Sequence, residues 1–210
     1  MTTRRPVVAG QFYPGSKEEL LREVREYLAG GTPAASSAPV SMVPHAGYPF
    51  SGGVAGRTLV RARPGRRVLL LGPNHTGLGK PFAVWSSGEW ELPGASLPVD
   101  EALATEVLQA HSALQEDQQA HVREHSLEVV LPFLYALDEA TRILPVAVAE
   151  NNPDTLIQVG EALAGVVSSQ SEPVSVVVSS DMSHFIPADR ARQLDEIALR
   201  AICDVDPEGL

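Results

Sequence analysis

The hydrophobic residues of this chain fall into short continuous runs, separated by longer stretches in which they recur at helical spacing. The run from Val174 to Ser180 is almost continuously apolar in its centre, which is typical of a strand buried on both faces of a sheet. Comparable runs predict further strands at residues 39–44, 67–71, 82–85 and 143–148. The segment 86–98 is rich in Gly, Pro and Trp and is expected to form a hairpin or an ordered loop whose tryptophans serve packing.

The intervening stretches predict helices. Ser16 and Glu19 form a capping box at the start of the first one, and Gly30-Gly31 ends it. A second is expected to open at Gly52-Gly53 and to bury Val54, Leu59 and Val60; others are predicted at residues 99–110, 126–137, 152–167 and after Pro187. This alternation predicts a single α/β domain over residues 1–210, with three layers (α/β/α) around a mostly parallel central sheet.

Composition narrows the classes of function. The chain has 210 residues, a net charge of −10 and one cysteine. Such an acidic chain argues against nucleic acid or an anionic membrane surface as a partner. No apolar run approaches the roughly 20 residues of a membrane span, and no signal peptide is recognisable. Together with the lone cysteine, these features favour a cytoplasmic protein.

Three histidines follow predicted strands directly: His45, His75 and His184, the last with Asp181 three residues before it. The carboxyl ends of parallel neighbours meet at one edge of a sheet, where open α/β folds place their ligands. Neutral imidazoles suit iron, zinc, copper or nickel, and two histidines with one carboxylate suit non-haem Fe(II). The spacing therefore predicts a shared metal site at this edge.

The other candidates are weaker. His125 is expected to orient a ligand from a second layer of contacts, and Ser126 to cap the following helix. His111 and His121 are expected to be solvated, and Cys203 to be a small buried residue. The glycines after His45 lack the pattern of a phosphate-binding loop, and the serines near His184 lack the Gly-x-Ser-x-Gly turn of a hydrolase.

Five motifs together resemble the Memo family, called AmmeMemoRadiSam system protein B in bacteria and archaea. They cover nearly the whole chain in order: residues 5–14 (RPVVAGQFYP), 43–52 (VPHAGYPFSG), 71–75 (LGPNH), 124–133 (EHSLEVVLPF) and 179–185 (SSDMSHF).

The resemblance implies a fold similar to the class III extradiol dioxygenases, and Fe(II) or copper as the cofactor. By motif, His45 and His75 correspond to metal ligands, and His184 with Asp181 to the catalytic acid/base position. Four further residues are expected to form a second layer or to contact the ligand: Asn74, Glu124, His125 and Tyr48.

Relatives are also expected to supply a cysteine ligand from a Cys-Gly motif near the C-terminus. Here Cys203 precedes Asp204, so it is not given that role. The start of a helix at Asp206-Pro207 has almost no chain after it. We therefore expect the family's C-terminal segment to be missing, an unprotected apolar surface near residues 195–210, and weaker metal binding than in a longer form.

The leading hypothesis is a metal-dependent redox or oxygenase protein acting on a small or peptide substrate, with proteins of the AmmeMemoRadiSam system as possible partners. Two alternatives remain open. One is a non-catalytic module that binds peptides or phosphopeptides in the same pocket. The other is an extradiol dioxygenase that opens catechol rings.

Overall fold

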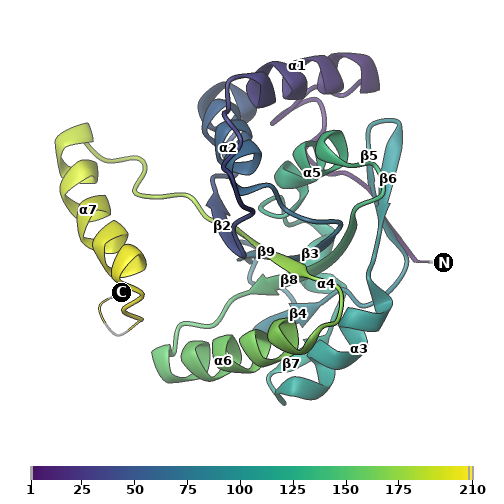
Figure 1. Cartoon of the computed structure of the whole chain (residues 1–210), viewed down its shortest axis with the longest axis vertical. Helices are drawn as coiled ribbons and strands as arrows, with labels where there is room; N and C mark the ends of the chain where they lie inside the picture. Colours follow the sequence, from purple (N-terminus) through teal and green to yellow (C-terminus); the bar gives the residue numbers. More distant parts are fainter. Residues whose placement is uncertain (1, 208, 210) are drawn as a thin grey trace.

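The structure, a computed structural model, describes residues 2–207 and 209 (Figure 1). Its helices are α1 (Lys17–Ala29), α2 (Tyr48–Ala62), α3 (Glu101–Ala110), α4 (Gln119–Val122), the short 3₁₀ helix η1 (Glu128–Val130), α5 (Leu131–Leu137), α6 (Pro153–Ser169) and α7 (Ala188–Asp204). Its strands are β1 (Thr3–Arg4), β2 (Val40–Val43), β3 (Arg67–Pro73), β4 (Phe82–Val84), β5 (Glu89–Leu92), β6 (Ala95–Pro98), β7 (Leu114–Glu116), β8 (Arg142–Val148) and β9 (Val174–Ser179).

The central sheet has six strands in the order β2-β9-β3-β8-β4-β7. The first four run parallel to their neighbours, and β4 turns antiparallel to β8. A smaller sheet, β1-β5-β6, contains the predicted hairpin of β5 and β6. Helices α1, α2 and α5 lie on one side of the central sheet and α3 and α6 on the other (Figure 1). The predicted three-layer α/β/α fold with a mostly parallel sheet, like that of the class III extradiol dioxygenases, is confirmed.

Helix α2 starts earlier than predicted. It begins at Tyr48, and Gly52 and Gly56 lie within it, one turn apart. A Cβ on Gly52 would come within 2.5 Å of the Tyr27 ring, and one on Gly56 within 2.7 Å of the Tyr27 backbone. These glycines therefore allow α1 and α2 to pack closely. Val54 is turned away from this contact and is 48% exposed, so its predicted burial is wrong.

Strand β9 is less covered than the sequence predicts. Val174 and Val177 are buried, but Val176 and Val178 are only half-buried. Val176, with Leu163 of α6 and neighbours on β2 and β3, lines an apolar cavity of about 320 Å³, and Val178 lines a separate cavity of about 660 Å³. Burial on both faces of β9 is therefore only partly realised.

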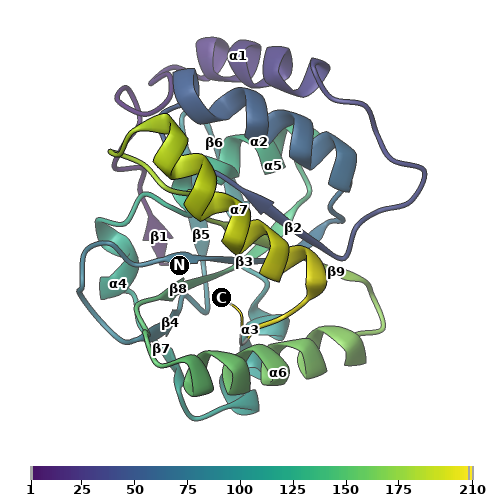
Figure 2. The same cartoon turned by 90° about the vertical axis from the view of Figure 1, so that its left-hand side faces the viewer.

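Helix α7 stands apart from the three layers in Figure 1 and crosses in front of them in Figure 2. Its apolar side chains are exposed: Ile197 is 63% accessible, and Val205, directly after the helix, is 85% accessible. The predicted apolar surface is thus confirmed for the described residues of this region. Cys203 is also exposed, so its predicted burial is wrong. No helix in the described part of the chain combines the length and apolarity that crossing a membrane requires.

The two tryptophans are core residues, as expected, but they share the core with a histidine. Trp85 and Trp90 are 3% and 0% exposed and meet edge to face. His121 lies against both rings, is fully buried, and bonds through Nε2 to the Ala83 carbonyl oxygen at 3.0 Å. The prediction that His121 is solvated is wrong, because α4 turns it inward beneath the small sheet.

Candidate metal centre

The exits of three neighbouring strands meet at one edge of the sheet. His45 follows β2 and His75 follows β3, on either side of β9. The ring centroids of the two histidines lie 5.3 Å apart. The parallel topology thus brings together two side chains that are 30 positions apart in sequence, as the strand pattern predicts.

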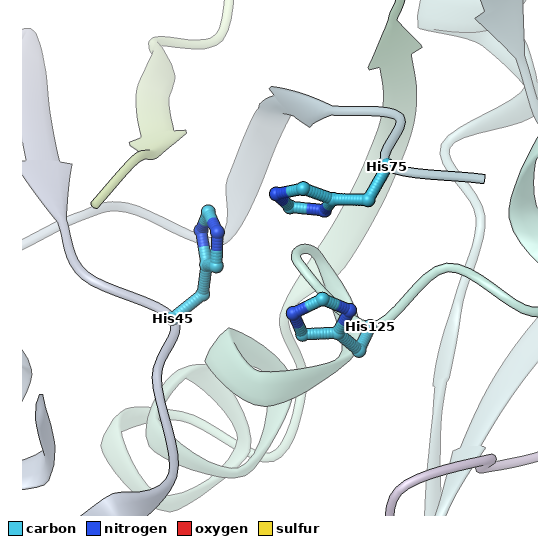
Figure 3. A group of neighbouring side chains, drawn as sticks. All are labelled: His45, His75 and His125. Carbon is cyan, nitrogen blue, oxygen red and sulfur yellow. The ribbon is translucent and has the colours of Figure 1, made fainter. Parts of the chain in front are cut away.

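A third histidine completes the cluster. His125, from the turn between α4 and η1, stacks on His75 with centroids 4.8 Å apart and lies 5.6 Å from His45. One ligand nitrogen from each of the three lies within 4.8 Å of the others. In Figure 3 the rings of His75 and His125 lie one above the other, and both point toward His45. This is a compact set of three imidazoles with carboxylates close by.

Glu124 holds two of these rings. Its carboxylate is 1% exposed; Oε1 accepts a 2.8 Å hydrogen bond from His75 Nδ1 and lies 3.3 Å from His125 Nδ1. The same carboxylate accepts the backbone N–H groups of His75, His125 and Ser126. A buried acid with five such contacts fixes both the rings and the loops that carry them.

The bonding assigns the tautomers. Ser179 Oγ donates its proton to the Ser126 carbonyl oxygen at 2.6 Å, so toward His45 Nδ1, 2.9 Å away, it accepts. His45 therefore carries hydrogen on Nδ1 and a lone pair on Nε2. His75, which donates from Nδ1 to Glu124, is arranged in the same way. Both rings present the Nε2 lone pair that a metal ion requires.

The electrostatics keep two of the rings neutral. Burial lowers the pKa of His45 to about 4; Asp181 opposes this shift, and the neighbouring His75 and His125 add to it. Burial also lowers the pKa of His125. Burial alone would raise the pKa of Glu124, but hydrogen bonds from the His75 ring and from backbone N–H groups outweigh it and lower the pKa. Near pH 7 these groups are neutral imidazoles beside a carboxylate.

Of the two predicted site residues that follow β9, only Asp181 lies close to this cluster. Asp181 Oδ1 accepts the backbone N–H of His45 at 2.7 Å, and its other oxygen lies 3.9 Å from His45 Nε2. His184 is exposed, bonds through Nδ1 to the Met182 carbonyl oxygen, and packs on Phe185. The structure therefore brings Asp181 to His45 but does not bring His184 into the group, because the chain turns outward toward α7.

Sequence comparison bears on this geometry. The Memo-like protein family matches residues 4–210. A MEMO1 family protein of Aquifex aeolicus is 42% identical over 213 residues, covering 100% of this chain and 78% of the relative. MEMO1 family proteins of Methanopyrus kandleri and Thermotoga maritima are 37% and 35% identical, covering 99% of this chain and 78% and 79% of their own lengths.

This chain belongs to the Memo-like protein family. Four of the five motifs quoted for the family resemblance lie at the exits of β2, β3 and β9 and at the turn of Glu124-His125, beside the cluster. The three-histidine arrangement is compatible with a metal site in this Memo-like protein.

Two other predicted site residues act indirectly. The Asn74 side chain bonds to Thr76 and to the Leu78 carbonyl oxygen, and so shapes the loop that carries His75. Tyr48 is 1% exposed and donates from its hydroxyl to the Val129 carbonyl oxygen at 3.0 Å, so its polar atom is used within the core. The cavity of about 210 Å³ that Tyr48 lines is separate from the three histidines.

Two residues contribute more than their sequence context indicates. His125 was expected in a second layer or in contact with the ligand, yet its ring lies with those of His45 and His75. Ser126, expected to cap a helix, instead donates to the Pro73 carbonyl oxygen at 2.7 Å and ties its turn to the end of β3. The adjacent acid and imidazole of Glu124-His125 were the available signal. What the sequence lacks is the distance between this turn and the strand exits.

Proposed function

We propose that this Memo-like protein binds one iron or copper ion through His45, His75 and His125. The observation that carries the proposal is the donor set: three imidazoles, one nitrogen of each lying within 4.8 Å of the others. Glu124 accepts a hydrogen bond from His75 and lies 3.3 Å from His125 Nδ1, and Ser179 bonds to His45. A histidine whose second nitrogen is bonded to a carboxylate or hydroxyl is the usual arrangement around a bound metal.

The residues fit the group. Imidazole nitrogen suits both iron and copper, and the low pKa of His45 leaves its lone pair free at neutral pH. His125 supplies the third ligand within this chain, where the family resemblance suggested a cysteine. Asp181, with an oxygen 3.9 Å from His45 Nε2, adds negative charge at the rim.

We propose further that the centre serves a redox or oxygenase reaction on a small substrate. A bound iron or copper ion would supply one-electron redox chemistry. A cavity of about 660 Å³ is lined by His75, by the polar residues Asn74, Ser180 and Glu150, and by apolar residues of the strand ends. In this scheme Asp181, which is half-buried and lines a second cavity of about 430 Å³, accepts a proton from a substrate that extends past Ser180, the residue that lines both cavities. The acid/base role expected of His184 remains a prediction, and it requires the β9 exit to turn inward.

The phosphopeptide alternative finds less support. Phosphate recognition generally uses arginine or lysine. The side chains around the cavity beside His75 and around the one beside Asp181 include carboxylates and no cationic residue other than the histidines. A ring-opening dioxygenase commonly uses two histidines and a carboxylate, whereas this cluster has three imidazoles.

Metal analysis of the full chain, purified without chelator and then titrated anaerobically with Fe(II) and with Cu(I), tests the proposal. We expect one ion per chain, lost in His45→Ala and kept in His111→Ala. His111 is a suitable control because its ring accepts the Ala113 N–H at the end of α3 and is not part of the histidine cluster. Equal binding by wild type and His45→Ala, or no stoichiometric binding at all, would overturn it. Oxygen uptake with catechols tests the ring-opening alternative separately.

A further inference from the structure

The N-terminal segment, residues 4–13, contacts the turn that carries Glu124 and His125. Arg4, at the end of β1, is 2% exposed. Its guanidinium donates to the carbonyl oxygens of His121 and Glu124 and pairs with the Glu128 carboxylate. It also lies 4.6 Å from the centroid of the Trp90 ring. A buried arginine with all of these partners has its planar donor set almost fully used.

Glu128 fixes the same segment from the other side. Its carboxylate is fully buried and accepts the backbone N–H groups of Val7 and Val8 and the Tyr13 hydroxyl, the last at 2.6 Å. Together with Arg4, these bonds join residues 4–13 to the turn 121–128. The two buried charges are paired and hydrogen-bonded, which makes this joint specific in geometry.

The turn held in this way is the one that orients the imidazoles. Arg4 bonds to the carbonyl oxygen of Glu124, whose carboxylate binds His75 and faces His125. The Phe12 ring meets the His125 ring edge to face at 4.9 Å. The Phe12 carbonyl oxygen is fixed in turn by the backbone N–H of Tyr48 at 2.8 Å. The segment therefore touches both members of the Glu124-His125 pair.

We propose that residues 4–13 are a positioning element of the metal centre, with Arg4 as its anchor and Phe12 as its contact to His125. Arg4 sets the place of the Glu124 backbone, and Phe12 sets the plane of the His125 ring. A lysine at position 4 would offer a point charge without the planar fork that reaches two carbonyl oxygens and a carboxylate at once. The proposal rests on the proposed metal binding, and its test includes a readout without metal.

The matched control is Arg67, a second buried arginine whose Nε bonds to Asp100 at 2.6 Å at the start of β3, away from the centre. The variants Arg4→Lys, Phe12→Leu and Arg67→Met are compared with wild type in two ways. Long-range ¹H–¹⁵N spectra of the metal-free protein at one fixed pH report which imidazole nitrogen carries hydrogen. Competition titration with Fe(II) reports affinity. Thermal melting of each variant confirms that it is folded.

We expect Arg4→Lys to shift the His75 and His125 nitrogen signals and to weaken Fe(II) binding by about 10–100-fold, the usual loss when a residue behind a ligand changes. Phe12→Leu, which leaves the buried pair intact, shifts the His125 signals alone. Arg67→Met lowers the melting temperature but leaves the imidazole spectra and the affinity unchanged.

Unchanged spectra in a folded Arg4→Lys or in Phe12→Leu overturn the positioning role. So does an equal change in Arg67→Met, because the effect would then be general destabilisation. If Arg4→Lys does not fold, Phe12→Leu and Arg67→Met decide the matter. If wild type binds no Fe(II), the proposed function fails, while the spectra of the metal-free protein still decide the positioning role.

Discussion

Two turns of this chain carry an acid close to a histidine, and the structure treats them in opposite ways. At Glu124-His125 the carboxylate is 1% exposed and the imidazole stands in the cluster. At Asp181 and His184 the carboxylate is 22% exposed and the imidazole faces solvent. Both turns come from motifs of the same family likeness, so the difference lies in what surrounds them.

The first turn is enclosed. Arg4, paired with Glu128, donates to its backbone carbonyl oxygens, and the Glu124 carboxylate accepts hydrogen bonds on both oxygens. The second turn leads into α7, which crosses in front of the three layers in Figure 2. The apolar side chains of α7, such as Ile197, are exposed. Burying a carboxylate without hydrogen-bond partners costs free energy, so a buried carboxylate is found with its partners in place. An exposed carboxylate can bond to water instead. Enclosure of the turn therefore determines which imidazole joins the cluster.

The largest contrast is expected between His125→Ala and His184→Ala. Removing His125 takes away a proposed ligand, so we expect Fe(II) affinity to fall about 1,000-fold, beyond the 10–100-fold typical of residues behind a ligand. His184→Ala is expected to stay within about threefold of wild type, because the ring lies outside the cluster. Anaerobic competition titration measures both. Similar losses in the two variants would show that the β9 exit folds inward when metal binds.

The next contrast concerns stability against pH, between buried His121 and exposed His184. Burial lowers the pKa of His121 to about 4 in the folded protein, against about 6.5 when unfolded. The unfolded chain therefore binds the proton first, and stability is lost as pH falls from about 6.5 to 4, by about 3 kcal/mol in total. Urea unfolding at pH 7 and pH 4.5 should show a smaller loss in His121→Gln than in wild type. His184→Gln should behave as wild type; no difference between these variants would contradict the account of the buried ring.

A smaller contrast is expected between the two carboxylates. Glu124→Gln keeps the shape of the side chain but removes the charge shared by His75 and His125, so metal affinity should fall about 10–100-fold. Asp181→Asn keeps an oxygen that can accept the His45 N–H, and its loss should be less than about tenfold. The same competition titration decides; a larger loss at Asp181 would make it a ligand in its own right.

The smallest effect is expected on α7. Ile197 is 63% exposed, so Ile197→Ser should change the free energy of unfolding by less than about 0.5 kcal/mol. Leu103, on α3 and fully buried, gives the matched case, where Leu103→Ala should cost about 2–5 kcal/mol. Denaturant unfolding of both variants measures the difference. A large cost at Ile197 would mean that α7 packs against the body in solution.

Much of this arrangement was readable from the sequence. Runs such as Val174–Ser180 placed the strands, and parallel strands predicted that His45 and His75 would meet. The sequence did not predict the burial of His121. Its neighbours in sequence are polar, whereas Trp85 and Trp90, which enclose it, lie more than 30 positions away. Periodicity describes one segment at a time, whereas these contacts join segments far apart.

The same limit applies to the centre itself. The sequence around Arg4 and around Glu128 does not indicate that these residues pair across 124 positions. In the fold, this pair lies against the turn that carries His125. Likewise, the tautomer of His45 depends on Ser179 donating to Ser126, a chain of bonds through three separate segments. The residue types of a candidate metal site could be predicted, but the position of His125 as the proposed third ligand could be seen only in the fold.

The central claim is that three imidazoles from this chain form the donor set. X-ray absorption of the protein loaded with one zinc ion, as a probe of the ligands, tests it most directly. Imidazole nitrogen is expected at about 2.0–2.1 Å from the ion and thiolate sulfur at about 2.3 Å. We expect three imidazole ligands and no sulfur ligand around zinc in wild type, and two imidazole ligands in His125→Ala. A wild-type spectrum with only two imidazoles, or one that His125→Ala leaves unchanged, would contradict it.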